Sequence, residues 1–265
     1  MITSASALIA KGFLFFSHES MVILLTTLGY LGFKRNIFAK ALCLLLFTMI
    51  FNAFLKSIWQ IPRPAEMGTG FAFPSGHMQT AVVFWCWIGF EFRHKYLWLF
   101  IAFLLSGIAF GLIHFNYHIL RDILGALLFG SLTIFCYASL LKTPFFRLYI
   151  SASGLILALI SIPLLIYNTR DSLSLWLAEG SLVGFSLGWL LQSKIGTIAS
   201  SLRIKLIQIT VALLGILAIQ FLFLGCIPHP PQALSVFVAY FAMGFWVSGI
   251  APLVGVRHGW HSVKR

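Results

Sequence analysis

The sequence predicts an all-α fold, a polytopic transmembrane helical bundle. Of the 265 residues, 60% are hydrophobic and only 9% are charged, whereas a soluble domain carries about a quarter charged residues. Apolar runs recur along the chain at the length of about 20 residues that crosses a bilayer. Only helices and closed barrels satisfy their backbone in lipid, and these runs are too long and continuous for barrel strands.

Short polar segments divide the chain into predicted helices. Residues 2–16 predict an interfacial helix or a weak first span, because the segment is short and Lys11 interrupts it. Residues 58–75 are rich in Pro and Gly and predict a long loop. We expect residues 1–141 to form a membrane core with the polar segments described below and 142–265 to form a C-terminal extension of about four helices. The other predicted helices are 20–33, 38–57, 75–91, 96–114, 118–141, 145–167, 173–191, 206–227 and 233–254.

The composition also excludes some classes of protein. The net charge is +12, but the basic residues stand singly and in pairs between apolar runs, as in loops that flank membrane helices. We therefore expect no nucleic-acid partner. No basic region precedes the first apolar stretch, so we expect no cleaved signal peptide. The cysteines lie in apolar segments without paired spacing, which predicts small core residues rather than metal ligands.

Three polar clusters interrupt the apolar sequence. They are the segments 56–64, with Lys56 and Arg63, 74–77, which reads Pro-Ser-Gly-His, and 118–122, with His118 and Asp122. Forty residues, mostly apolar, separate His77 from His118. Because one membrane crossing takes about 20 residues, this interval predicts two crossings, which return the chain to the membrane face where His77 lies. The three clusters are therefore expected to meet on one membrane face.

The distribution of basic residues predicts which face that is. Only four of the 18 Lys and Arg residues lie on the side of the clusters, namely Lys56, Arg63, Arg121 and Arg170. Most of the others lie on the opposite side, and cytoplasmic loops carry the excess of Lys and Arg. The sequence thus predicts a multi-pass protein of the cytoplasmic (inner) membrane with its clusters on the extracytoplasmic side.

The residue types in the clusters suit phosphoryl transfer. His118 and Asp122 lie four apart at a predicted helix start, so the carboxylate can hold one ring nitrogen and leave the other free to attack. His77 is suited to proton donation. Positive charge comes from Lys56 and Arg63, and a helix start offers N–H groups to an anion. This set favours a metal-free reaction through a phosphohistidine, with no cofactor.

Each cluster has an ordinary structural interpretation as well. A lone Lys56 near a helix end is typical of a snorkelling lysine. Pro-Ser-Gly is a common loop-to-helix joint, and His118 with Asp122 is compatible with a simple hydrogen bond. However, ionisable residues at membrane level are functional candidates by default. Three such clusters converging on one face favour the functional interpretation.

The order Lys-x6-Arg-Pro, Pro-Ser-Gly-His and His-x3-Asp, on this pattern of spans, resembles the type 2 phosphatidic acid phosphatase superfamily over about residues 38–141. The resemblance implies that His118 is the nucleophile, Asp122 its orienting partner and His77 the acid for the leaving oxygen. It also implies which residues hold the phosphoryl oxygens, namely Lys56, Arg63, Ser75 and Gly76.

The third motif departs from this pattern. The family has Ser-Arg, with the Arg six residues before the nucleophile, where this chain has Gly111 and Leu112. We therefore expect a substitute cation that binds the substrate, and Arg121 is the first candidate, since it is three residues from His118 on a helix. Alternatively Arg121 only snorkels. His114 is a second candidate, with a loop histidine as its ordinary interpretation.

The resemblance implies a lipid phosphatase that hydrolyses a lipid phosphomonoester or pyrophosphate. Its expected partners are that substrate and membrane lipids. One alternative is a lipid phosphotransferase that passes the phosphoryl group to a second acceptor. The other is a non-catalytic transporter or scaffold.

Within the extension, Glu179 is expected to face the bundle interior, where it contacts a headgroup or pairs with Arg170. Gly180, Gly184 and Gly188 recur every four residues and predict close helix packing.

Overall fold

The computed structural model describes residues 4–63, 70–167, 173–195, 201–225 and 233–254, and it confirms the all-α fold class. Over these ranges every regular element is a helix, and the extended backbone is limited to an isolated antiparallel bridge between Pro62 and Phe71. The α-helices are α1 (Ser4–Phe15), α2 (Glu19–Gly32), α3 (Arg35–Trp59), α4 (Gly76–Phe92), α5 (Lys95–His114), α6 (Leu120–Leu140), α7 (Pro144–Leu148), α8 (Ala152–Tyr167), α9 (Leu173–Ile195), α10 (Leu202–Gln220) and α11 (Ala233–Phe245).

Several of these helices can cross a membrane. In the described part of the chain, six are long and apolar enough, and a seventh span results if the bent pair α1 and α2 is one crossing. Helices α4 and α8, with 17 and 16 residues, are shorter. The protein is therefore a multi-pass membrane protein.

The predicted helices recur in the structure, with changes at their ends. The first two elements meet at a bend of 44°. The predicted span 145–167 is divided into α7 and α8, and the helix predicted from 206 begins at Leu202, which is preceded by the capping hydroxyl of Ser201. Helix α6 begins at Leu120 rather than at 118. The end predicted at 227 lies outside the described residues.

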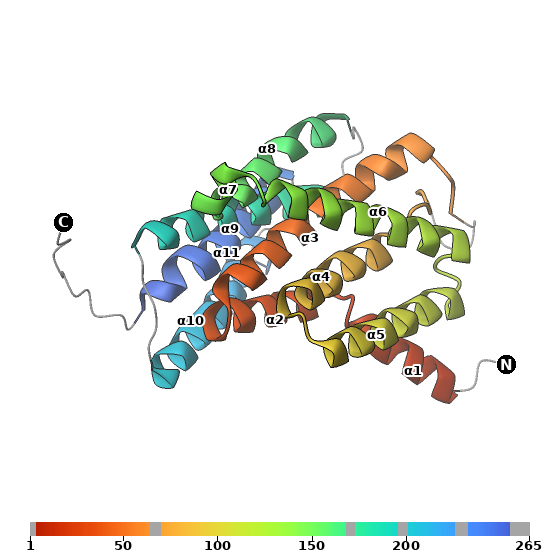
Figure 1. Ribbon diagram of the computed structural model, residues 1–265, viewed down its shortest axis with the longest axis horizontal. Coiled ribbons are helices and arrows are strands. Elements are labelled where there is room, and N and C mark those ends of the chain that lie inside the picture. Colours follow the sequence, from red (N-terminus) through yellow and green to blue (C-terminus); the bar gives the residue numbers. More distant parts are fainter. Residues whose placement is uncertain (1–3, 64–69, 168–172, 196–200, 226–232, 255–265) are drawn as a thin grey trace.

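Helix α3 is the centre of the bundle. It packs against α2, α4 and α6 and also against α8 and α9 (Figure 1). Near its start, Lys40 forms an ion pair with Glu91 at the end of α4, and its ammonium lies 5.5 Å from the centre of the Trp87 ring. Its other end, at the right of Figure 1, lies on the same side of the molecule as the start of α6. Helix α3 thus connects the membrane core to the C-terminal helices.

Glycines hold α9 close to α11. A Cβ atom at Gly180 would meet the backbone oxygen of Phe237, and one at Gly184 would meet that of Phe241. A Cβ at Gly188 would meet the hydroxyl oxygen of Ser248. Small residues let membrane helices approach to backbone contact, so the repeat serves packing, as the sequence predicts.

The buried acid of the extension also has a partner. Glu179 is 5% exposed, and its Oε2 accepts a hydrogen bond of 2.6 Å from the Ser161 hydroxyl of α8. It faces the bundle interior, as predicted. Arg170, the alternative partner, lies outside the described residues.

We predict that Gly184→Ala lowers the melting temperature of the detergent-solubilised protein. The added methyl group forces α9 away from α11, and overpacking of this kind costs about 1–3 kcal/mol. Gly12→Ala is the matched control, because nothing lies within 4 Å of a Cβ there. Equal melting temperatures for the two variants would contradict the close packing.

Candidate active site

The three polar clusters meet where α3 ends and where α4 and α6 begin. The backbone N–H of Ser75 donates a hydrogen bond of 3.1 Å to the Asp122 carbonyl oxygen, which joins the second cluster to the third. A cavity of about 520 Å³ opens beside this junction. Five of the predicted site residues line it, namely Lys56, Arg63, Gly76, His77 and His118. The structure therefore brings residues from all three clusters to one cavity.

His118 and Asp122 form a buried pair. His118 Nδ1 lies 3.3 Å from Asp122 Oδ2, and the two residues are 8% and 2% exposed. The same carboxylate oxygen accepts a hydrogen bond from the Ile119 N–H, also at 3.3 Å. Asp122 thereby caps the first turn of α6, and His118 lies just before the helix rather than on its face. The contact to Nδ1 leaves Nε2 as the nitrogen that can attack a substrate.

The surroundings of His118 favour its neutral form. Burial lowers the pKa of His118 to about 4, although the hydrogen bond to Asp122 raises it. The positive charges of Lys56 and Arg63 lower the pKa further. A neutral imidazole can donate from Nδ1 to Asp122 and keep a lone pair on Nε2. His118 is thus suited to act as a nucleophile at neutral pH.

The start of α4 forms another wall of the cavity. Ser75 is fully buried, and its hydroxyl accepts a hydrogen bond of 3.4 Å from the Met78 N–H as the cap of α4. Gly76 and His77 follow and line the cavity, with the His77 ring exposed to it. The first N–H groups of a helix have no partner within it, so this end suits an anion. Ser75 acts here through the cap, and its contact with a substrate remains a prediction.

Asn52 is a residue of this site that the sequence analysis did not single out. It is 5% exposed, and its Nδ2 donates to the Pro74 carbonyl oxygen at 3.2 Å and to Gln79 Oε1 at 2.7 Å. These bonds hold the start of α4 against α3. Its Oδ1 would lie 3.1 Å from a Cβ at Gly76, so a larger residue at position 76 would crowd the amide. A signal existed in the sequence, since Asn52 is a lone amide one helical turn before Lys56.

The loop between α3 and α4 places Arg63. Its N–H donates a hydrogen bond of 3.1 Å to the Gly70 carbonyl oxygen, and the Ala72 N–H donates to the Ile61 carbonyl oxygen at 2.8 Å. These two bonds flank the bridge between Pro62 and Phe71. They hold the exposed Arg63 at the wall of the cavity, although residues 64–69 lie outside the described part.

The candidates for a substitute cation lie away from the cavity wall. Arg121 places its guanidinium carbon 5.9 Å from the centre of the Phe73 ring and its Nη2 3.4 Å from Asp122 Oδ1. Arg121 therefore contacts Asp122 on the side away from the cavity. Phosphate binding by Arg121 remains a prediction, because its half-exposed side chain would have to rotate toward the cavity. The His114 ring stacks on Phe110 at 5.2 Å between ring centres. Leu112 is 1% exposed and packs in the apolar core.

The described residues contain no group of three or more His, Cys, Asp or Glu side chains placed to hold a metal ion. The ionisable groups that line the cavity are two imidazoles, Lys56, Arg63 and the phenol of Tyr240. Metal independence itself remains a prediction.

Comparison with known families supports the resemblance from a separate part of the chain. A family model described as PAP2 superfamily phosphatase, transmembrane extension, matches residues 176–262. Over the described residues this region includes most of α9 together with α10 and α11, whereas the three motifs lie in the first half. The match supports membership of the PAP2 superfamily of phosphatases and a phosphatase-type activity. No curated protein and no solved structure matches the chain.

We predict that His118 reacts with diethyl pyrocarbonate, which modifies neutral imidazole, at an undiminished rate down to roughly one pH unit above its pKa. The rate should then fall with a midpoint near pH 4, because burial lowers the pKa to about 4. Mass spectrometry of the peptide that contains His118 measures the modification. In Asp122→Asn the midpoint should move lower still, because Asp122 raises this pKa. A midpoint near the ordinary value of 6.5 would contradict the burial of the neutral ring.

Proposed function

We propose that this membrane protein is a phosphatase that hydrolyses a phosphomonoester or pyrophosphate carried by a lipid, without a metal ion and through a phosphohistidine at His118. The observation that carries the proposal is one cavity lined by Lys56, Arg63, His77 and His118 at its polar end and mostly by apolar side chains beyond. A lipid phosphate has the same division into an anionic headgroup and a hydrocarbon chain.

The first half-reaction transfers the phosphoryl group to the protein. His118 Nε2 attacks phosphorus, so that a P–N bond forms while the P–O bond to the lipid breaks. Asp122 holds Nδ1–H and stabilises the positive ring. His77 donates its proton to the leaving oxygen, which departs as a lipid alcohol or lipid phosphate. Lys56, Arg63 and the N–H groups that begin α4 neutralise the charge on the phosphoryl oxygens.

The second half-reaction removes the phosphoryl group from His118 by hydrolysis. Water gives a proton to the now neutral His77 and attacks phosphorus, and the P–N bond breaks. Inorganic phosphate leaves, and His118 returns to its neutral form. Because Lys56 and Arg63 supply the positive charge, the scheme requires no divalent metal.

The proposed location is the extracytoplasmic side of the cytoplasmic (inner) membrane. The support is the small share of Lys and Arg on the side of the clusters. A site at membrane level also gives a lipid direct access from the outer leaflet.

We predict that the purified protein releases phosphate from a lipid phosphate in excess chelator, and that vanadate inhibits this release. His118→Ala should lose at least about 10³-fold in rate with every substrate, because no nitrogen remains to attack. His77→Ala should be slow with a lipid phosphate but partly recover with p-nitrophenyl phosphate, whose leaving group needs no proton. Phosphate release measured with both substrates tests the roles.

Recovery of both variants by the activated substrate would overturn the assignment of nucleophile and acid. Loss of activity in chelator with recovery on adding Mg²⁺ would overturn the metal-free scheme. If the phosphoryl group appears only on an added lipid acceptor and never as free phosphate, the protein is a phosphotransferase.

The orientation is tested by single cysteines at the two ends of α6. In a background without native cysteines, Tyr117→Cys should react with an impermeant maleimide on intact cells, because the loop before α6 faces outward. Thr143→Cys should react only after the membrane is opened. Both side chains are exposed in the structure. The opposite labelling pattern would place the site in the cytoplasm.

A further inference from the structure

The cavity continues far beyond the catalytic cluster along one face of α3. From Lys56 its wall passes Asn52, Met49, Leu45 and Leu42, which are three or four residues apart and so share a helix face. The 14 positions from 42 to 56 correspond to about 21 Å at the helical rise of 1.5 Å per residue. This length exceeds half the thickness of the hydrocarbon core of a bilayer, which is about 30 Å.

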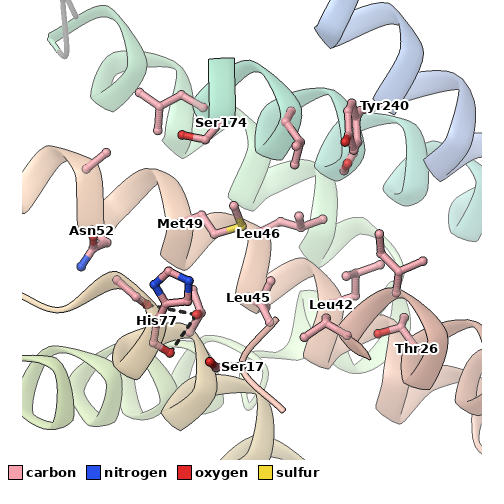
Figure 2. A pocket seen from close by; sticks show the side chains of 18 of the residues that line it. Ser17, Thr26, Leu42, Leu45, Leu46, Met49, Asn52, His77, Ser174 and Tyr240 are labelled. Carbon is pink, nitrogen blue, oxygen red and sulfur yellow. Dashed lines mark hydrogen bonds between the residues drawn. The ribbon is translucent and has the colours of Figure 1, made fainter. Parts of the chain in front are cut away.

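Helices of the C-terminal extension form the opposite wall. Figure 2 shows Ser174 and Tyr240 across the cavity from the α3 side chains, with His77 near Asn52 and Thr26 near Leu42. This wall is formed by α9, α10, α11 and the π-helix Trp246–Ile250 that follows. Apart from Ser174, Ser181 and Tyr240 its side chains are apolar, namely Leu175, Leu177, Phe185, Ile216, Met243 and Val247. The extension thus completes a chamber that the membrane core leaves open.

Phe185 and Val247 lie at the deep end of this chamber. The hydroxyl of Ser186, the neighbour of Phe185, is 3.6 Å from the sulfur of Cys43, the neighbour of Leu42. Behind Phe185 stands the buried Tyr30, with ring centres 5.1 Å apart. The Tyr30 hydroxyl donates a hydrogen bond of 3.0 Å to the carbonyl oxygen of Ser248, which follows Val247. This packing fixes both residues as a floor.

We propose that the C-terminal helices hold the hydrocarbon chain of the substrate, and that Phe185 and Val247 limit the length of chain the enzyme accepts. The proposal rests on the proposed function, because the chain enters the chamber with its phosphate at Lys56, Arg63 and His118. Burial of a chain against apolar walls is favourable in proportion to the area buried. The volume, about 520 Å³, lies within the range of about 300–1,000 Å³ of ligand sites.

The test compares two lysophosphatidic acids that differ only in their chain, stearoyl or decanoyl. In Val247→Phe the larger side chain raises the floor, so the ratio of kcat/KM for stearoyl to that for decanoyl should fall at least about tenfold, as expected for a change of a few methylene groups in an apolar pocket. The matched control is Val238→Phe on α11, since Val238 is 39% exposed and does not line the cavity. The control should keep the ratio of the unmodified protein.

An unchanged ratio in Val247→Phe, or an equal fall in Val238→Phe, would overturn the chamber. Should Val247→Phe fail to fold, Leu42→Phe narrows the same depth from the α3 wall and is expected to shift the ratio in the same direction. If the unmodified protein hydrolyses both lipids and the ratio of their kcat/KM values is the same in all variants, the proposed function stands and the chamber is refuted.

A binding measurement does not depend on hydrolysis. A long-chain alkyl phosphonate with a diazirine at the chain end should, on illumination, label the peptides that contain Phe185 or Val247. Excess stearoyl lysophosphatidic acid should suppress this labelling. Labelling that persists under competition shows that the probe partitions non-specifically into lipid or protein, and it overturns the proposal. Suppressible labelling without phosphate release would keep the chamber and refute the proposed hydrolysis.

Discussion

One backbone hydrogen bond determines the geometry of the site, from the Ser75 N–H to the Asp122 carbonyl oxygen at 3.1 Å. It joins the start of α4, which carries His77, to the start of α6, which carries Asp122, the partner of His118. The two residues also cap these helices, Ser75 through Met78 and Asp122 through Ile119. Because helix caps and the junction use the same residues, the helix starts cannot move without disturbing the pair of His118 and Asp122.

Several polar groups at membrane depth are held in pairs. Asn52 donates to Pro74 and Gln79, Lys40 pairs with Glu91, and Glu179 accepts from Ser161. An isolated polar group in an apolar environment costs several kcal/mol, and ionisable residues in membranes are accordingly paired or placed at cavities. Lys56 and Arg63 are placed at a cavity, since both line it. Their side chains thereby face the cavity rather than the packed interior.

The two halves of the chain share α3. Its junction with α4 forms the polar end of the cavity, while α9 and the helices beyond it line the apolar remainder. The family match covers only these C-terminal helices, and the three motifs lie before them. The cavity is the feature that connects both parts. Because helices of the extension line this cavity, the extension lies next to the candidate site.

The sequence by itself determined the helices and the motifs, because hydropathy and capping act over a few neighbouring residues. The spans, the Ser75 cap and the glycine stripe of α9 could all be predicted in this way.

The tertiary structure decided what depends on contacts between distant segments. Asn52 holds α4 through residues more than 20 positions away, and Arg121 lies over the ring of Phe73. Asp122 caps α6 so that His118 precedes the helix. The cavity itself needs walls from α2, α3, α4, α9, α10 and α11, and no local pattern specifies how these helices pack together.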